Sequence, residues 1–372
     1  MKIAVFYYVN FSGAKRVVAE HVKGLVALGN TVDVYTTDSH KDIFNPGLYA
    51  SNVYLYNFSP RKFNVSVVKR VKEDFYDTFF VLKNLHRKIA MDIDKAGYDI
   101  VLLHTDIHTQ APFLLRYLKT KNVYFCLEPL RNAYEYSLRL AGDFSIFNKA
   151  YETLNRWIRK NIDRENTLSA DHVVTLSLFA RERIIASYDL YPEISYLGID
   201  ESVFKPIKID KKKQILFVAN KEFIYGYDLA KKAVDRIPKK IRPELKIINW
   251  KKHNSERISD VDLVRTYNES LIVLSLSRFD TFGLVPLESM ACAVPVIALN
   301  VAGYRETIVD SRTGYLVDFN PEEISEKIVN LISNQNSARE MGENGRKWIL
   351  DKWTWRMRVK RLNDLLQKYS GK

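Results

Sequence analysis

The stretch SRFDTFGLVPLESMACAVPVIA, residues 277–298, places two carboxylates, Asp280 and Glu288, eight positions apart. A Phe-Gly pair and a Pro lie between them, and a Val-Pro-Val-Ile run follows. The residues before it, LIVLSLS at 271–277, are typical of a buried strand. Because Pro is tolerated in the first turn of a helix, the pattern predicts a strand, a loop at 278–282, a helix that begins near Gly283 to Pro286, and a second strand.

A helix that begins just after a buried strand offers a site for a phosphate. Its first backbone N–H groups and the positive end of its dipole attract anions. Gly283 would let a diphosphate approach the backbone, and Glu288 would accept hydrogen bonds from ribose hydroxyls. Asp280 would hold sugar hydroxyls or stabilise positive charge at an anomeric carbon. A second interpretation stays open, in which Asp280 only caps the helix and Glu288 is an exposed helix residue.

Similar patterns of short apolar runs and helical spacing extend through the chain. We expect strands at 2–9, 31–37, 98–105, 121–128, 171–177, 213–220, 245–250, 271–277 and 294–299, and helices at 15–29, 227–237 and 352–370. Near-continuous apolar strands separated by helices indicate parallel sheets covered on both faces. The series restarts near residue 207, after a Lys-rich turn. The sequence therefore predicts an α/β protein of two doubly wound domains, with ligands at the carboxyl ends of the strands in a cleft between the domains.

The opening stretch resembles the E-x7-E signature of retaining glycosyltransferases of the GT-B fold, family 4 in particular. Two further segments are similar to the family: VAGYRETIVDSRTGYLVD at 301–318, and the hinge strand YLGIDESVFKP at 196–206. Leu263 and Tyr267 match the family's L-x-x-x-Y pattern. The resemblance covers nearly the whole chain. It implies an acceptor-side domain at 1–196, a nucleotide-sugar domain at 197–351, and a C-terminal helix at 352–372 that crosses back to the first domain.

The resemblance also implies an activity, the transfer of a sugar from a nucleoside diphosphate donor to a glycan or lipid-linked acceptor with retention of configuration. No metal or other cofactor is expected. The residues assigned by the resemblance are Asp280 and Glu128 as catalytic; Glu288, Gly283, Leu284, Phe282, Thr281, Lys221 and Gly13 at the donor; and His104, Asp106 and Arg131 on the acceptor or sugar side. Glu128 and Arg131 lie in LEPLRNAYEYS, which resembles the family's HEPPRxxYE segment. For His104, a hydrogen-bonded histidine at a strand end is the alternative.

Several positions depart from the family pattern. Asp280 is one methylene shorter than Glu, and Leu127 stands where many members have His. Asn220 and Tyr225 stand where the donor-phosphate Arg and Lys are expected, and Lys221 could supply one charge. Two hypotheses follow: a divergent active transferase, or a weakened subunit that binds nucleotide sugar or glycan without turnover. The joint presence of Asp280, Gly283 and Glu288 favours the first.

The charge composition of the chain indicates what kind of partner it binds. Lys and Arg number 57 and Asp and Glu 44, a net charge of +13 that suggests an anionic partner. The two cysteines, Cys126 and Cys292, suit a reduced compartment, and the first residues read as a strand rather than a signal peptide, so we expect a cytoplasmic protein. Basic residues among Phe, Val and Leu at 61–95 predict peripheral contact with an anionic membrane, although a solvated two-helix flank is the alternative. Interspersed acids and the lack of a nucleic-acid motif argue against nucleic acid.

Overall fold

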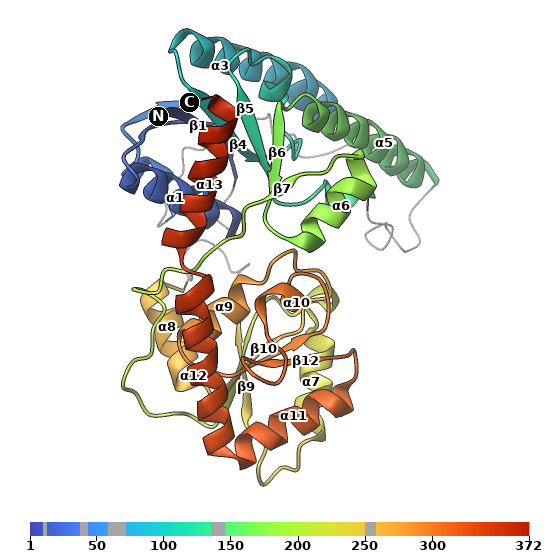
Figure 1. Ribbon diagram of the computed structural model, residues 1–372. Helices are drawn as coiled ribbons and strands as arrows, with labels where there is room; N and C mark the ends of the chain where they lie inside the picture. Colours follow the sequence, from blue (N-terminus) through green and yellow to red (C-terminus); the bar gives the residue numbers. More distant parts are fainter. Residues whose placement is uncertain (10–12, 38–43, 59–71, 135–145, 250–257, 372) are drawn as a thin grey trace. The chain divides into compact units, whose positions relative to one another are not determined.

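The computed structural model describes residues 1–9, 13–37, 44–58, 72–134, 146–249 and 258–371 (Figure 1). Contacts divide the chain into two units. Unit 1 comprises residues 1–176, 180–196 and 359–372, and unit 2 comprises 177–179 and 197–358. Residues 359–372 thus group with the first unit although they end the chain.

Unit 1 is built on a seven-stranded parallel sheet of order β3-β2-β1-β4-β5-β6-β7. Its strands are β1 Lys2–Tyr8, β2 Thr31–Thr36, β3 Asn52–Leu55, β4 Ile100–Asp106, β5 Asn122–Cys126, β6 His172–Thr175 and β7 Glu193–Ile194. Its longer helices are α1 Gly13–Ala27, the π-helix η2 Lys72–Leu82, α3 Lys83–Lys95, α5 Ile146–Leu168, α6 Leu178–Tyr188 and α13 Trp355–Ser370. The short turns are η1 Pro46–Leu48, η3 Phe113–Arg116 and α4 Arg131–Tyr134. The strand order reverses between β1 and β4, so the loops that follow these two strands flank the switch point where such sheets bind ligands.

The core of unit 1 lies on both faces of this sheet. On one face, side chains of β1, β4 and β5 pack against Ile89 and Ile93 of α3 and Ile184 of α6. Helices α1 and α13 lie together on the sheet (Figure 1), where a Cβ on Gly24 would come within 2.7 Å of Val359. Strand β4 is buried along its whole length, as expected of a central parallel strand covered by helices.

Unit 2 has a five-stranded parallel sheet of order β12-β11-β10-β8-β9. Its strands are β8 Gln214–Val218, β9 Glu244–Ile248, β10 Ile272–Ser275, β11 Val296–Leu299 and β12 Tyr315–Val317. Its helices are η5 Phe223–Tyr225, α7 Tyr227–Arg236, α8 Asp260–Glu269, α9 Leu284–Ala291, α10 Tyr304–Thr307, α11 Pro321–Ser333 and α12 Gln335–Lys352. Helix α7 packs with α11, and α9 packs with α12. The order reverses between β8 and β10, so the loops after these two strands flank the switch point of this unit.

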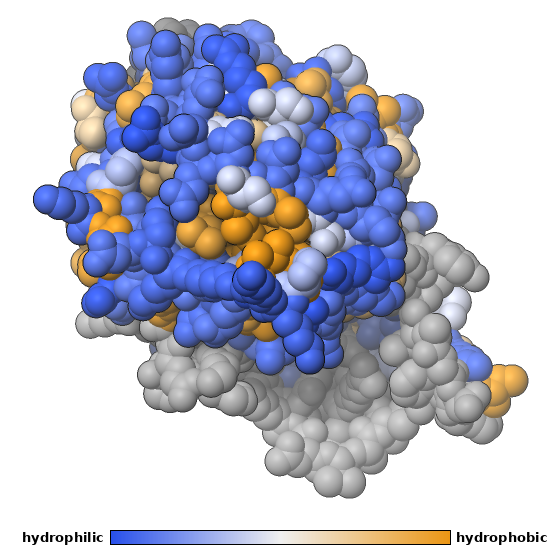
Figure 2. Space-filling view, turned by 90° about the horizontal axis from the view of Figure 1, so that it is seen from below, coloured by the Kyte–Doolittle hydropathy of each residue, from blue (hydrophilic) through white to orange (hydrophobic). Residues whose placement is uncertain are grey.

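The molecular surface is largely hydrophilic on the face shown in Figure 2, around one compact apolar patch. Scattered apolar side chains at a surface are normal in folded proteins. Within the described ranges, the helices lack the combination of length and apolar character needed to cross a membrane.

Candidate active site

The turn before α9 is ordered by Asp280. Its Oδ1 accepts hydrogen bonds from the N–H groups of Phe282 (3.2 Å) and Gly283 (2.8 Å), and its Oδ2 accepts one from the Tyr304 hydroxyl (3.1 Å). Burial, together with the neighbouring Asp280 carboxylate, raises the pKa of Tyr304 well above its usual value, so the phenol stays a donor. The Gly283 amide is therefore bonded inside the turn, whereas the resemblance implied that the N–H groups of both Gly283 and Leu284 would be offered to the diphosphate. The amides of the first turn of α9, from Leu284 on, are the group that remains for that role.

Only glycine fits at position 283. Its φ is +91°, and an added Cβ would lie 2.6 Å from the Tyr304 ring. The ring that carries the hydroxyl bonded to Asp280 thus packs directly on the backbone at the helix start. The Phe282 side chain is buried and meets the Trp353 ring edge-on at 5.7 Å between centroids. This packing anchors the turn in the core of unit 2. Thr281 accepts a 2.6 Å hydrogen bond from the Ser177 hydroxyl through its carbonyl.

Glu288 lies on α9 with only 4% of its surface exposed. Its Oε2 accepts a 2.7 Å hydrogen bond from the hydroxyl of the fully buried Tyr267 of α8. The interpretation of Glu288 as an exposed helix residue is therefore wrong. The Tyr267 contact holds the carboxylate, and sequence reasoning missed it although it had singled out Tyr267.

The loop after β8 lies beside this turn, since the Arg278 N–H donates to the Ile224 carbonyl at 2.9 Å. Lys221 of this loop is exposed, with its ammonium 6.0 Å from the centre of the Tyr227 ring. Arg278 was not predicted. Its guanidinium binds both oxygens of Asp228 (2.9 and 3.0 Å) and lies over the Phe223 ring at 3.7 Å.

Burial opposes ionisation of Asp228, but the hydrogen bonds and charge of Arg278 outweigh it and hold the pKa of Asp228 below its usual value. The ion pair ties the loop after β10 to the first turn of α7. The basic residue nearest to Asp280 in sequence is thus engaged in the scaffold.

In unit 1, three of the predicted residues lie at the carboxyl end of the sheet. Gly13 is exposed and begins α1, in the connection after β1. Glu128 follows β5, and its carboxylate lies 3.9 Å from Arg131 of α4. Both side chains are part-exposed, at 31% and 25%. They form one ion pair that is in part accessible to solvent.

The other two, His104 and Asp106, are buried in unit 1, at 1% and 0% exposure. His104 Nε2 lies 3.4 Å from His21 Nδ1, and burial lowers the pKa of His104 to about 3. Asp106 Oδ1 accepts from the N–H groups of His108 (2.7 Å) and Thr109 (2.9 Å). The assignment of these two side chains to a sugar cleft is therefore corrected: they pack and order the loop after β4. A position at a strand end does not reveal whether a side chain points out or in.

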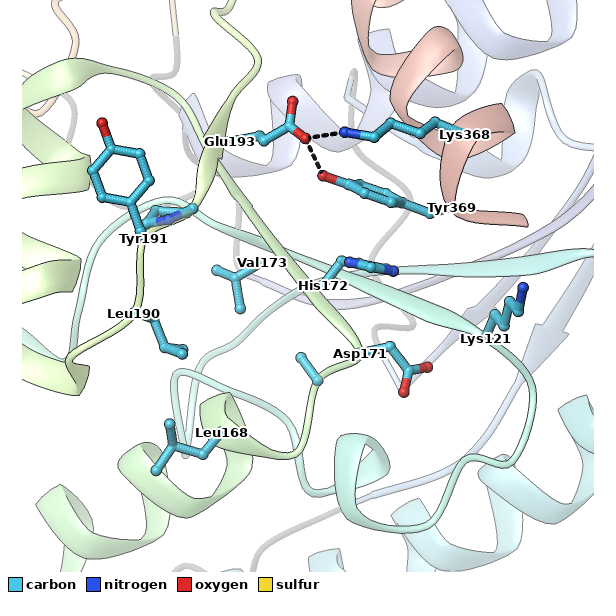
Figure 3. Close-up of a pocket in the computed structure, with 12 residues that line it drawn as sticks. Lys121, Leu168, Asp171, His172, Val173, Leu190, Tyr191, Glu193, Lys368 and Tyr369 are labelled. Carbon is cyan, nitrogen blue, oxygen red and sulfur yellow. Dashed lines mark hydrogen bonds and ion pairs between the residues drawn. The ribbon is translucent and has the colours of Figure 1, made fainter. Parts of the chain in front are cut away.

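A pocket of about 700 Å³ lies at the opposite edge of the unit 1 sheet (Figure 3). Lys121, His172 and Glu193 stand at the amino ends of β5, β6 and β7, away from the edge where parallel sheets bind substrates. Here the Tyr369 ring stacks on His172 at 3.7 Å, and Glu193 accepts hydrogen bonds from Lys368 and the Tyr369 hydroxyl. We read this region as the anchor of α13.

Comparison with known proteins identifies the family. A model described as Glycosyltransferase Family 4 matches residues 11–203, which is 193 of 372 residues. The chain belongs to glycosyltransferase family 4. A second model, Glycosyl transferases group 1, matches residues 253–348, the part that contains Asp280 and Glu288. In the part of this family 4 protein that the structure describes, His, Cys, Asp and Glu form no group of three that could hold a metal ion.

Two curated relatives match the family 4 chain over short regions. One is the GDP-mannose-dependent alpha-(1-6)-phosphatidylinositol monomannoside mannosyltransferase of Mycolicibacterium smegmatis, 42% identical over 85 residues, 23% of this chain and 22% of the relative. Another is the alpha-1,3/1,6-mannosyltransferase ALG2 of Dictyostelium discoideum, 34% identical over 90 residues, 24% of this chain and 21% of the relative. The matched part of the chain thus spans about a fifth of the length of each.

Solved structures match over the whole chain. A sucrose-phosphate synthase from Thermosynechococcus elongatus superposes with a TM-score of 0.71 at 16% identity, covering 99% of this chain and 98% of that one. Anabaena HepE in complex with UDP gives a TM-score of 0.71 at 13% identity, covering 99% and 100%. The fold of this family 4 protein is GT-B, as its sequence predicted.

Proposed function

We propose that this family 4 protein transfers a sugar from a nucleoside diphosphate donor to a glycan or lipid-linked acceptor with retention of configuration. The observation that carries the proposal is the turn that Asp280 holds at the start of α9, because it sets a carboxylate and a helix N-terminus side by side at the switch point of unit 2. The diphosphate would bind the first-turn amides of α9. Asp280 would lie near the anomeric carbon, and Glu288, held by Tyr267, would bind the ribose.

The proposed step is a front-face substitution. The bond between the anomeric carbon and the diphosphate oxygen breaks, and a bond from that carbon to the acceptor oxygen forms on the same face. The acceptor hydroxyl proton passes to the leaving diphosphate. Stabilising the leaving group is the main task of such a site, and Lys221, exposed on the neighbouring loop after β8, would supply a positive charge for it. No metal is expected in this scheme.

The donor is proposed from the relatives. The two curated relatives described above are mannosyltransferases by name, and one is named as GDP-mannose-dependent. Their matches are local, so we propose GDP-mannose as the first donor to test, with UDP- and ADP-sugars beside it.

The acceptor side is proposed to contact an anionic membrane, in a protein of the cytoplasm. Residues 61–71 of the segment predicted to do so lie outside the described residues. In the remainder, Tyr76 and Phe80 of η2 are 52% and 63% exposed, and Arg87 and Lys88 are exposed on the following helix. Aromatic side chains beside cations are what an interfacial helix presents to anionic lipid. Co-sedimentation with vesicles of 30% phosphatidylserine, but not with pure phosphatidylcholine, is the expected result.

Calorimetric titration with the donor panel, with and without EDTA, tests the proposal when a product assay follows. Binding that EDTA does not affect, with release of nucleoside diphosphate, supports a metal-independent transferase. Binding without turnover supports the weakened-subunit hypothesis. That hypothesis rests on Asn220 and Tyr225, which stand where the donor-phosphate Arg and Lys are expected. Tyr225→Lys would then raise activity in a weakened enzyme and leave it unchanged where Lys221 already serves.

A further inference from the structure

One face of α5 carries a row of four polar side chains, Arg156, Arg159, Asp163 and Asn166, which we name the α5 row. Their spacing of three, four and three residues places them on one side of the helix. Asp163 and Asn166 are fully buried. A helix that only packs against a sheet buries an apolar stripe, so a buried carboxylate and a buried amide at these positions require another explanation.

The α5 row bonds the backbone of the loop after β4, residues 107–112. Arg159 donates to the His108 carbonyl at 2.5 Å. Asp163 Oδ1 accepts from the Ala111 N–H at 3.2 Å, and Asn166 donates to the Ala111 carbonyl at 2.7 Å. Both polar groups of the Ala111 backbone are therefore fixed by α5. This loop flanks the switch point between β1 and β4.

The same row reaches the loop after β5, which we take with the start of α4 as residues 127–132. Asp163 Oδ2 accepts from the Leu130 N–H at 3.5 Å, and Arg156 donates to the Asn132 carbonyl. Leu130 and Asn132 are the sequence neighbours of Arg131. Arg131 forms the part-exposed ion pair of the candidate site with Glu128. One carboxylate, Asp163, thus joins two loops that are separate in sequence.

The arrangement is costly, which argues that it does more than fill space. Burial raises the pKa of Asp163 to about 7, although the Tyr188 hydroxyl (2.5 Å) and the Ala111 and Leu130 N–H groups favour its charged form. A buried carboxylate is tolerated when its hydrogen bonds are complete. Here two of the hydrogen bonds of Asp163 come from the backbone N–H groups of Ala111 and Leu130. Both residues lie in loops at the carboxyl edge of the sheet, where parallel sheets bind ligands.

We propose that the α5 row is the positioning device of the acceptor side: it sets the separation of the loops 107–112 and 127–132, and Asp163 is its central positioning residue. This rests on the proposed function for its substrate. It predicts that weakening the row loosens both loops together and impairs binding of the acceptor, whereas the donor, bound in unit 2, is held as before.

The test compares the full chain with Asp163→Asn, whose amide replaces an acceptor by a donor toward Leu130 and Tyr188. Asn161→Asp is the matched control, since it makes the reverse amide-to-carboxylate change at an exposed position of the same helix. Hydrogen exchange followed by mass spectrometry measures the amide exchange rates of the two loops, 107–112 and 127–132. Steady-state kinetics use GDP-mannose as donor and octyl α-mannoside as the acceptor probe.

We expect exchange in both loops to rise about tenfold or more in Asp163→Asn, with a severalfold rise in KM for octyl α-mannoside, no change in KM for GDP-mannose, and no effect in the control. Unchanged exchange in the loops overturns the proposal. So does loosened exchange with an unchanged acceptor KM, or an equal rise in both KM values. If Asp163→Asn fails to fold, Arg159→Gln replaces it under the same criteria. If the parent enzyme transfers no sugar, the proposed function fails, and the KM comparison fails with it. The exchange comparison still decides whether the α5 row holds the two loops.

Discussion

Gly283→Ala tests the geometry of the turn before α9. An alanine at φ +91° costs about 1–2 kcal/mol for the left-handed backbone. The new Cβ would also lie 2.6 Å from Tyr304, and a clash of this kind in a packed core costs about 1–3 kcal/mol. Because the Tyr304 ring is buried and its hydroxyl is bonded to Asp280, it cannot swing away cheaply. We therefore expect unit 2 to lose about 2–5 kcal/mol of unfolding free energy.

Gly29→Ala is the matched control for the backbone effect. Gly29 has φ +84°, and an added Cβ there meets no atom within 4 Å. It should cost only the left-handed term, about 1–2 kcal/mol, in unit 1. Hydrogen exchange measured separately on peptides of each unit reports both free energies. Equal losses for the two variants, or a loss below about 0.5 kcal/mol at Gly283, would refute the packing of Tyr304 on the helix start.

Three further predictions follow from the described contacts. Glu288→Gln should keep the Tyr267 hydrogen bond and the fold but lose turnover, whereas Glu288→Ala should also cost about 1–3 kcal/mol because it strands a buried hydroxyl; a fully active Glu288→Gln in a product assay would remove Glu288 from the mechanism. Burial lowers the pKa of His86 to about 4 and of His104 to about 3, below the value of about 6.5 in the unfolded chain. Unit 1 should therefore keep this stability above pH 6.5 and lose it as the pH falls from there toward 4, by about 3 kcal/mol for His86 alone; acid titration of unit 1 exchange with a flat profile from pH 7 to 4 would contradict this. Glu193→Gln removes the charge that Lys368 and Tyr369 bind and should speed exchange in the last turns of α13 severalfold, at a cost of about 1 kcal/mol.

The sequence was sufficient for nine of the twelve strands in the described residues, all but β3, β7 and β12, and for the helix at the site. Strand β10 and helix α9 lie within a few residues of their predicted positions, because a long apolar run, a Gly and a Pro mark both boundaries. Helix α5 was not predicted. Its sequence is amphipathic, but the buried face also carries Asp163 and Asn166, polar residues that do not by themselves mark a buried position. Strand β3 was missed because it is an exposed edge strand.

The partners of the residues singled out at the candidate site were not predicted. Asp280 and Glu288 were found from the motif, yet the side chains that orient them, Tyr304 and Tyr267, lie 24 and 21 positions away. Such long-range bonds are set by how the helices stack, which periodicity does not encode. The same limit explains His104, whose strand-end position is compatible with both an exposed and a buried side chain.

The assignment of residues 359–372 to unit 1 has a consequence for biosynthesis. The chain leaves the ribosome from its amino end, so the first sheet is synthesised long before α13 is available to cover it. Unit 2, apart from residues 177–179, is one continuous segment that is complete by residue 358. We expect the nascent chain to finish unit 2 first, and the apolar face that Val359 and Leu362 cover in the finished protein to stay open until the last helix emerges.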